Sequence, residues 1–240
     1  MSNELVPVDL SQLPSTQLGS DDAFADLAKG GDFLARLQLY SKGSAVDQQL
    51  IAPGHWGIPE SAEDITDLGE SIDVLPLARR PKALDMNDRD AVIAAYDMES
   101  DEFKRIMAAA QGKDSGCMYG PSFLVIERST GRFLEYFCGT KSTRSEAKKI
   151  YPFLPLTPGD IEARGLDGVD PHGPLPVTLR VKYIKKKFSW HAPVVIKCST
   201  PFQQLPMPAV IVKQVQDFIN PKEPTVEKVD EKDAGKRRAR

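Results

Sequence analysis

Hydrophobic and polar residues alternate in several short segments of the chain, which is the spacing of strands that bury one face. The alternation is clearest in 177–183, where Val, Leu and Tyr residues occupy one face and Thr, Arg and Lys residues the other. Residues 188–197 follow closely enough to form the antiparallel return strand of a hairpin. Pro76, in a further strand expected at 71–77, has no amide hydrogen to donate to a neighbouring strand. This strand should therefore lie at the edge of a sheet or contain a bulge. By the same pattern we expect further strands at 33–40, 71–77, 123–127 and 132–137.

Three other segments have the spacing of helices. Ser100 is a suitable N-cap, and apolar residues then recur at intervals of three and four over 103–110. Residues 143–146, Thr-Arg-Ser-Glu, have the spacing of a capping box, which predicts a short helix after the hairpin at 123–137. A closing helix is expected over 208–219, with its apolar side formed by Val212, Val215, Gln216 and Ile219.

The distribution of proline, glycine and charge predicts the domain boundaries. Residues 152–176 contain six prolines and four glycines, so we expect a long loop there. Residues 1–30 hold five acids and one base, which predicts a mobile acidic arm with a short helix around 22–28. The charged residues of 220–240 predict a disordered tail. We therefore expect one globular domain over 31–219, of the α+β class, β-rich, with short helices inserted between the strands.

The composition is that of a folded protein of the cytoplasm. Hydrophobic residues make up 41% of the chain and charged residues 27%, which is ordinary for a globular domain. No stretch approaches the ~20 apolar residues of a membrane span, and the first residues lack the basic and apolar regions of a secretory signal. The three cysteines are widely spaced, which is not a disulfide framework. A reducing compartment and no membrane partner are therefore expected.

Charge is unevenly distributed along the chain. The net charge is −3, yet no acidic residue lies between Asp170 and Asp217. Residues 57–78, by contrast, contain six acids and no base. Such separation produces a field of one sign on part of the surface, as expected of a polyanion-binding site. The seven cations of the basic stretch are Arg180, Lys182, Lys185, Lys186, Lys187, Lys197 and Lys213.

Aromatic residues are interleaved with these cations. Lysines neutralise phosphates while flat rings stack on exposed bases, at about 1–3 kcal/mol for each stacked base. A duplex hides its base faces, so rings among lysines favour single strands. The alternative is that the hairpin merely has a solvated basic face and that its rings belong to the core. Including nearby cations, the candidate binding residues are Arg79, Arg80, Arg180, Lys182, Tyr183, Lys185, Lys186, Lys187, Phe188, Trp190, His191 and Lys197.

The sequence contains no motif that indicates catalysis, a cofactor or a metal. No two cysteines have the C-x-x-C spacing and the three histidines are isolated, so no metal site is predicted. Cys117, close to Gly116 and Gly120, is the best candidate for a nucleophile, but nothing in the sequence supplies a base for it. The protein is therefore not expected to be an enzyme, and an enzyme built around Cys117 is the least favoured reading.

The order of elements resembles that of phage-encoded single-stranded DNA-binding proteins with an OB-type fold. The resemblance covers 30–200 and depends on the strand at 33–40, the strand at 71–77 ahead of Arg79 and Arg80, and the return strand at 189–191. It implies a partly open barrel and a non-catalytic part in DNA replication or recombination. This chain departs from the pattern, because its tail turns basic at 236–240 where many such proteins end in acids that recruit partners. The residues to which the resemblance extends are Arg180, Lys182, Lys185, Lys186, Lys187, Phe188 and Trp190.

The sequence thus predicts a non-catalytic protein that binds single-stranded nucleic acid, DNA rather than RNA, as an accessory of replication or recombination. A second copy of the chain and replication proteins are open as further partners. The compartment expected is the cytoplasm, that of the host cell if the gene belongs to a phage. The rival hypothesis is a structural or protein-interaction component, of a virion or a regulatory complex, without a nucleic-acid site.

Overall fold

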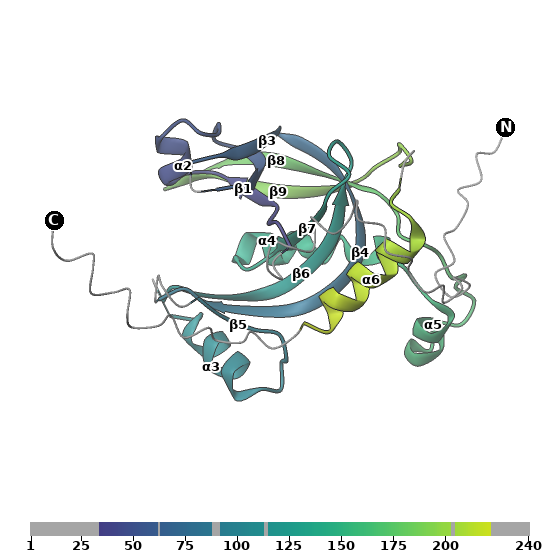
Figure 1. Cartoon of the computed structure of the whole chain (residues 1–240). Coiled ribbons are helices and arrows are strands. Elements are labelled where there is room, and N and C mark those ends of the chain that lie inside the picture. The colour runs from purple at the N-terminus through teal and green to yellow at the C-terminus, as the bar shows by residue number, and fades with distance from the viewer. Residues whose placement is uncertain (1–33, 62, 88–91, 113–114, 203–204, 222–240) are drawn as a thin grey trace, which may run out of the picture.

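Two antiparallel sheets form the body of the protein in the computed structural model, which describes residues 34–61, 63–87, 92–112, 115–202 and 205–221 (Figure 1). The smaller sheet has the order β1-β2-β3, and the larger has the order β7-β6-β4-β8-β9, with β5 also paired to β4. The strands of the smaller sheet are β1 (Gln38–Tyr40), β2 (His55–Pro59) and β3 (Ile65–Gly69). Those of the larger are β4 (Ser71–Asp85), β5 (Ile93–Ala95), β6 (Cys117–Glu127), β7 (Phe133–Phe137), β8 (Val177–Lys185) and β9 (Ser189–Lys197).

The helices lie between and around the strands. They are α2 (Ser44–Asp47), α3 (Asp101–Ala109), α4 (Lys141–Ala147), the 3₁₀ turn η3 (Tyr151–Phe153), α5 (Pro158–Arg164) and α6 (Pro208–Ile219). The Ser100 side chain caps α3 as predicted, accepting a hydrogen bond from the Phe103 amide. The predicted loop at 152–176 is wrong in part, because it contains η3 and α5. The sequence Thr157-Pro158 explains α5, since Thr157 caps it and proline suits its first position.

The capping box predicted at 143–146 is also wrong by three residues. The cap of α4 is Thr140, whose hydroxyl accepts a hydrogen bond from the Thr143 amide while the Thr143 side chain accepts one from the Thr140 amide. Two threonines can satisfy the same reciprocal bonds that a Thr-Glu pair usually satisfies. The helix therefore begins directly after β7 and its connecting glycine.

Strand β4 organises the larger sheet because it pairs with three neighbours. Its first residues, 71–74, pair with β8; residues 74–85 pair with β6; and its last three pair with β5. The register shifts between Pro76 and Ala78, so the predicted bulge is confirmed, at a central rather than an edge strand. The strand continues well past residue 77, the predicted end, because β6 pairs with it as far as Asp85.

The main core lies between the two sheets. Trp56 and Ile58 of β2 are fully buried against Val74 of β4, Phe123 of β6 and Leu179 of β8. The rings of Trp56 and Tyr136 meet edge-on, with centroids 5.5 Å apart. Burial of this set on one side of each strand explains the alternation in the sequence of β8.

The opposite face of the larger sheet is covered in part by α6. Ile211 and Phe218 are its buried residues, and they pack on Leu75 and Leu124. The apolar side predicted for this helix is therefore wrong: Val215 lies at the contact, but Ile219 is exposed and Gln216 faces solvent. Beyond α6 the same face becomes polar, with Arg80, Lys82 and Glu135 in place of aliphatic side chains.

The chain crosses between the sheets just before β1. The amide of Leu37 donates to the Glu135 carbonyl and the Glu135 amide donates to the Ala35 carbonyl, both at 2.9 Å, so this segment runs parallel to β7. The predicted strand at 33–40 is thus split between two partners. Among the described residues, the strand pairings do not close into a barrel. The predicted helix at 22–28 and both predicted mobile ends lie mainly outside the described residues.

Candidate nucleic-acid interface

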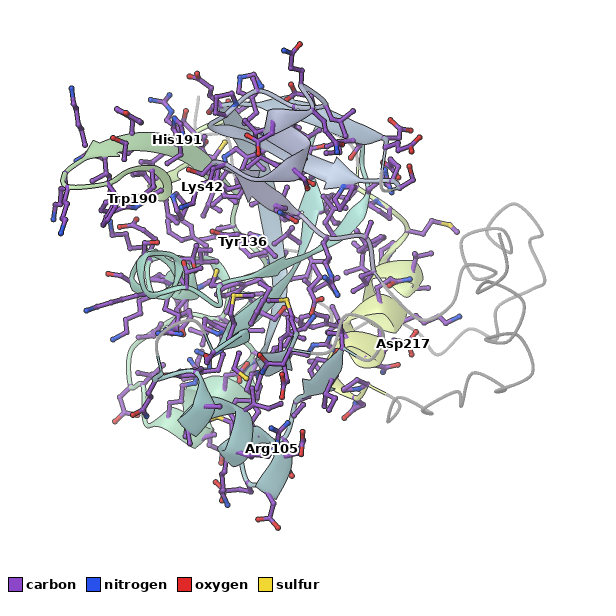
Figure 2. The ribbon with its side chains drawn as sticks, turned by 90° about the vertical axis from the view of Figure 1, so that its left-hand side faces the viewer. Lys42, Arg105, Tyr136, Trp190, His191 and Asp217 are labelled. Atoms are coloured by element: carbon purple, nitrogen blue, oxygen red, sulfur yellow. The ribbon has the colours of Figure 1, made fainter. Side chains whose placement is uncertain are left out.

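The β8–β9 hairpin extends beyond the sheet to which it belongs. Pairing of β8 with β4 ends at Arg180, whereas its pairing with β9 continues to Lys185. Residues 182–191, named the arm from here on, therefore form a two-stranded ribbon. In this ribbon β8 pairs with β9 on one side, and no described strand pairs with its other side. Figure 2 shows this ribbon, on which Trp190 and His191 are labelled, projecting from the body of the molecule.

The pairing register distributes the predicted binding residues over two faces and a tip. Residues that pair across an antiparallel ladder lie on the same face. One face therefore carries Tyr183, Lys185 and His191, and the other carries Arg180, Lys182 and Trp190. The turn at the tip carries Lys186, Lys187 and Phe188.

The rings and lysines of the arm are open to solvent. Phe188 is 74% exposed and Tyr183 is 55% exposed, which is unusual for large apolar side chains. Trp190 is half-buried, whereas the other tryptophan, Trp56, is completely buried in the core. The four lysines of the arm are exposed, and within the described part of the chain no carboxylate forms an ion pair with any of them.

The base of the arm is fixed to the smaller sheet. The Ser41 hydroxyl accepts a hydrogen bond of 2.9 Å from the His191 amide. Gly54 packs so closely that a Cβ there would lie 2.8 Å from the His191 ring, and its φ of +87° also favours glycine. The Tyr183 and His191 rings contact each other with centroids 5.1 Å apart. Lys42, adjacent to Ser41, adds a cation beside this base (Figure 2).

The outer edge of β9 is covered along its middle. Ser41 caps the His191 amide, residue 193 is a proline without an amide hydrogen, and the Glu146 carboxylate accepts from the Val195 amide at 3.3 Å. These three features hinder another strand from pairing with the middle of β9. The arm therefore has a defined position and presents side chains, rather than the β9 backbone, to a ligand.

Helix α4 brings further cations next to the hairpin. It packs against β9 (Figure 1), and both Lys141, its first residue, and Lys148, its C-cap, are exposed. Arg144, between them in sequence, donates to the carbonyls of Tyr119 and Gly139 and is held in place. The sequence prediction missed this group, although basic residues at 141, 144 and 148 have the spacing of one helix face.

Three of the predicted cations lie away from the arm. Arg80 is mostly buried: it donates to the Glu135 carboxylate at 2.9 Å and to the Phe218 carbonyl at 2.7 Å. Arg79 is exposed but stacks on the Tyr151 ring at 4.3 Å, on the face of β4 opposite to Arg80. Lys197 is exposed at the far end of β9, where it pairs with Val177.

Cys117 has surroundings that disfavour a thiolate. It is buried at the start of β6, and burial together with the nearby Asp85 carboxylate raises its pKa. Hydrogen bonds from the Asn87 backbone and from Arg105 hold the pKa of Asp85 down at about 2, so that carboxylate stays charged. A thiol beside a fixed negative charge is a weak nucleophile at neutral pH.

The described residues contain neither a candidate metal site nor a helix that could span a membrane. No group of three or more His, Cys, Asp or Glu side chains lies close enough together there to hold a metal ion. None of the helices in that part of the chain combines the length and the apolar character that crossing a bilayer requires.

The structure thus places eight of the predicted residues in the arm and Arg180 at its base, and it places Lys197 at the far end of β9 and Arg79 and Arg80 on β4. Comparisons of this chain with protein-family models, with curated proteins and with solved structures found no match, so the interface is interpreted from its own geometry and chemistry.

Proposed function

We propose that this protein binds single-stranded nucleic acid, DNA in preference to RNA, through the arm, and that it does so without catalysing a reaction. The observation that carries the proposal is the exposure of Tyr183 and Phe188 on a projecting ribbon, among four lysines that form no ion pair with a described carboxylate. Exposed rings stack on bases and lysines neutralise phosphates, a combination that requires unpaired bases.

The arrangement of the rings suggests how a strand is held. Tyr183 and Trp190 lie on opposite faces of the arm and Phe188 lies at its tip, so one strand can contact all three only by crossing the tip. A duplex is too stiff to follow that path and hides its base faces. The lysines at 185–187 lie along the same path and neutralise the phosphates.

The fold proposed along with this function is a partly open OB-type barrel, supported by the segment at 35–37 that links the β7 edge to the smaller sheet. The resemblance to phage single-stranded DNA-binding proteins supports a role in replication or recombination in the cytoplasm, with replication proteins or a second copy of the chain as further partners. The rival proposal is that the arm contacts an acidic protein surface, as in a structural or adaptor component.

A binding titration distinguishes these proposals. A fluorescently labelled 20-nucleotide DNA strand, the same strand as a duplex and the same strand as RNA are titrated with the full chain at 50 mM salt, with anisotropy as the readout. We expect the DNA strand to bind at least tenfold more tightly than the duplex. Equal affinity for strand and duplex would mean that only charge is recognised, and no binding at micromolar protein would favour the protein-interaction role.

A further inference from the structure

A buried polar cluster lies on the face of the larger sheet beyond α6, away from the arm. The Glu135 carboxylate accepts hydrogen bonds from Arg80 at 2.9 Å, from Lys82 at 2.5 Å and from Ser122 at 2.8 Å. Lys82 is only 3% exposed and Glu135 only 5%. Ser122 reaches Glu135 from the neighbouring strand β6, and Arg80 and Lys82 reach it from β4, across β6.

The cluster opens into a cavity of about 280 Å³ between β4, β5 and the segment before β1. Arg36 reaches this cavity because its backbone bridges to Glu135 on the edge of β7. The polar part of the lining is thus formed by two cations and a phenol. The remaining residues are apolar, and the full lining is Arg36, Lys82, Leu84, Val92, Ala94 and Tyr96.

The charges around the cavity do not balance. Among the described residues, Arg80 and Lys82 bond the single carboxylate of Glu135, and the exposed Arg36 lies near Lys82, so the formal charges of these four residues leave an excess of two positive charges. Burial, with Arg36 and Arg80 nearby, lowers the pKa of Lys82, although Glu135 opposes this shift. Uncompensated charge is costly in a poorly solvated site, so an anion in the cavity would stabilise it.

The apolar side of the cavity is suited to a flat group. The Tyr96 ring already stacks under the Arg80 guanidinium at 4.0 Å, and burial raises the Tyr96 pKa, which keeps the phenol neutral and able to donate. Leu84, Val92 and Ala94 complete that side without charge. A ligand here therefore combines an anionic head with an apolar or aromatic body.

We propose that this cavity binds a phosphate monoester of about the size of one nucleotide. A phosphate monoester has a charge of about −1.5 to −2 at neutral pH, which matches the excess of two cations, whereas a carboxylate would leave one of them unbalanced. The Arg36 guanidinium can bind two phosphate oxygens at once. The volume lies just below the roughly 300–1,000 Å³ of small-molecule pockets, so it admits one nucleotide and not several. The ligand is a free nucleotide or the 5′-phosphate end of a strand.

The experiment measures heat of binding by titration of the full chain with adenosine monophosphate, inorganic phosphate and adenosine. We expect adenosine monophosphate and inorganic phosphate to bind and adenosine to bind at least tenfold more weakly than its monophosphate. Arg36→Gln, which changes an exposed side chain, should weaken the monophosphate at least tenfold. Tyr96→Leu should weaken adenosine monophosphate more than inorganic phosphate, because the variant loses a hydrogen-bond donor for both ligands but a stacking partner only for the nucleotide.

The matched control is the arm variant Lys185→Gln/Lys186→Gln/Lys187→Gln, which should bind adenosine monophosphate like the unmodified protein. Loss of binding in this variant, or unchanged binding in Arg36→Gln, would overturn the proposal. Competition with a 5′-phosphorylated and a 5′-hydroxyl strand separates the sources: displacement by the phosphorylated strand alone identifies a strand end, and displacement by neither identifies a free nucleotide. Both results support the site, and neither depends on binding by the arm.

Discussion

The salt dependence of strand binding should decrease when the three lysines at the tip of the arm are replaced. Lys185, Lys186 and Lys187 are exposed and form no ion pair with any described carboxylate, so each is free to neutralise one phosphate. On single strands each neutralised phosphate contributes about 0.7 to the slope of log K against log salt. Three glutamines should therefore reduce the slope by about 2. Over a fourfold rise in salt, the unmodified protein should lose roughly 20-fold more affinity than the variant.

The assay is an anisotropy titration of a labelled 20-nucleotide strand at several concentrations between 50 and 200 mM NaCl. A matched control removes three positive charges from exposed residues on helices outside the arm. Its substitutions are Lys104→Gln on α3, Arg164→Gln on α5 and Lys213→Gln on α6. The control should retain the slope of the unmodified protein. If both triple variants shift the slope equally, net charge rather than the arm governs binding, and the reasoning is wrong.

Three smaller predictions concern the arm, its anchor and Asp85. Phe188→Ala should weaken strand binding by about 1–3 kcal/mol with an unchanged salt slope, because stacking releases no counterions; a changed slope would contradict this. Ser41→Ala leaves the His191 amide without its partner and should lower the free energy of unfolding by about 1 kcal/mol in urea, with Ser41→Thr as control. Because folding lowers the Asp85 pKa to about 2, its contribution to stability is present above about pH 4 and is lost as the pH falls toward 2. Asp85→Asn should flatten that acid limb in thermal melts; an unchanged limb would assign it to other carboxylates.

The elements that the sequence predicts well are those whose burial repeats along the chain. Strands β8 and β9 and helix α3 each place one regular side against the core, so their spacing is visible. Strands β2 and β3 were not predicted, because β2 contains Gly57 and Pro59 and β3 is polar. Glycine is favoured at 57 because a Cβ would lie 2.6 Å from the Ile51 side chain, a contact that depends on folding.

The candidate site could be predicted from the sequence only in its location. Interleaved lysines and rings identify the hairpin, but the register decides that Tyr183 and Trp190 occupy opposite faces. Arg80 is adjacent to Arg79 in sequence, and yet Arg80 is mostly buried and Arg79 is exposed, because Glu135 lies next to Arg80 across β6. A contact between residues 55 positions apart, such as Arg80 with Glu135, depends on the order of strands in the sheet. The spacing of residues within one segment does not indicate that order. The cavity at Arg36 was missed for the same reason.

Photo-crosslinking can show whether the arm contacts the bases of a bound DNA strand. A DNA strand with 5-iodouracil in place of thymine is irradiated with the full chain, and the attached peptides are identified by mass spectrometry. If bases stack on the arm, we expect crosslinks to its rings, at Tyr183, Phe188 and Trp190. Crosslinks confined to peptides outside 182–191, with none on the arm, would contradict it.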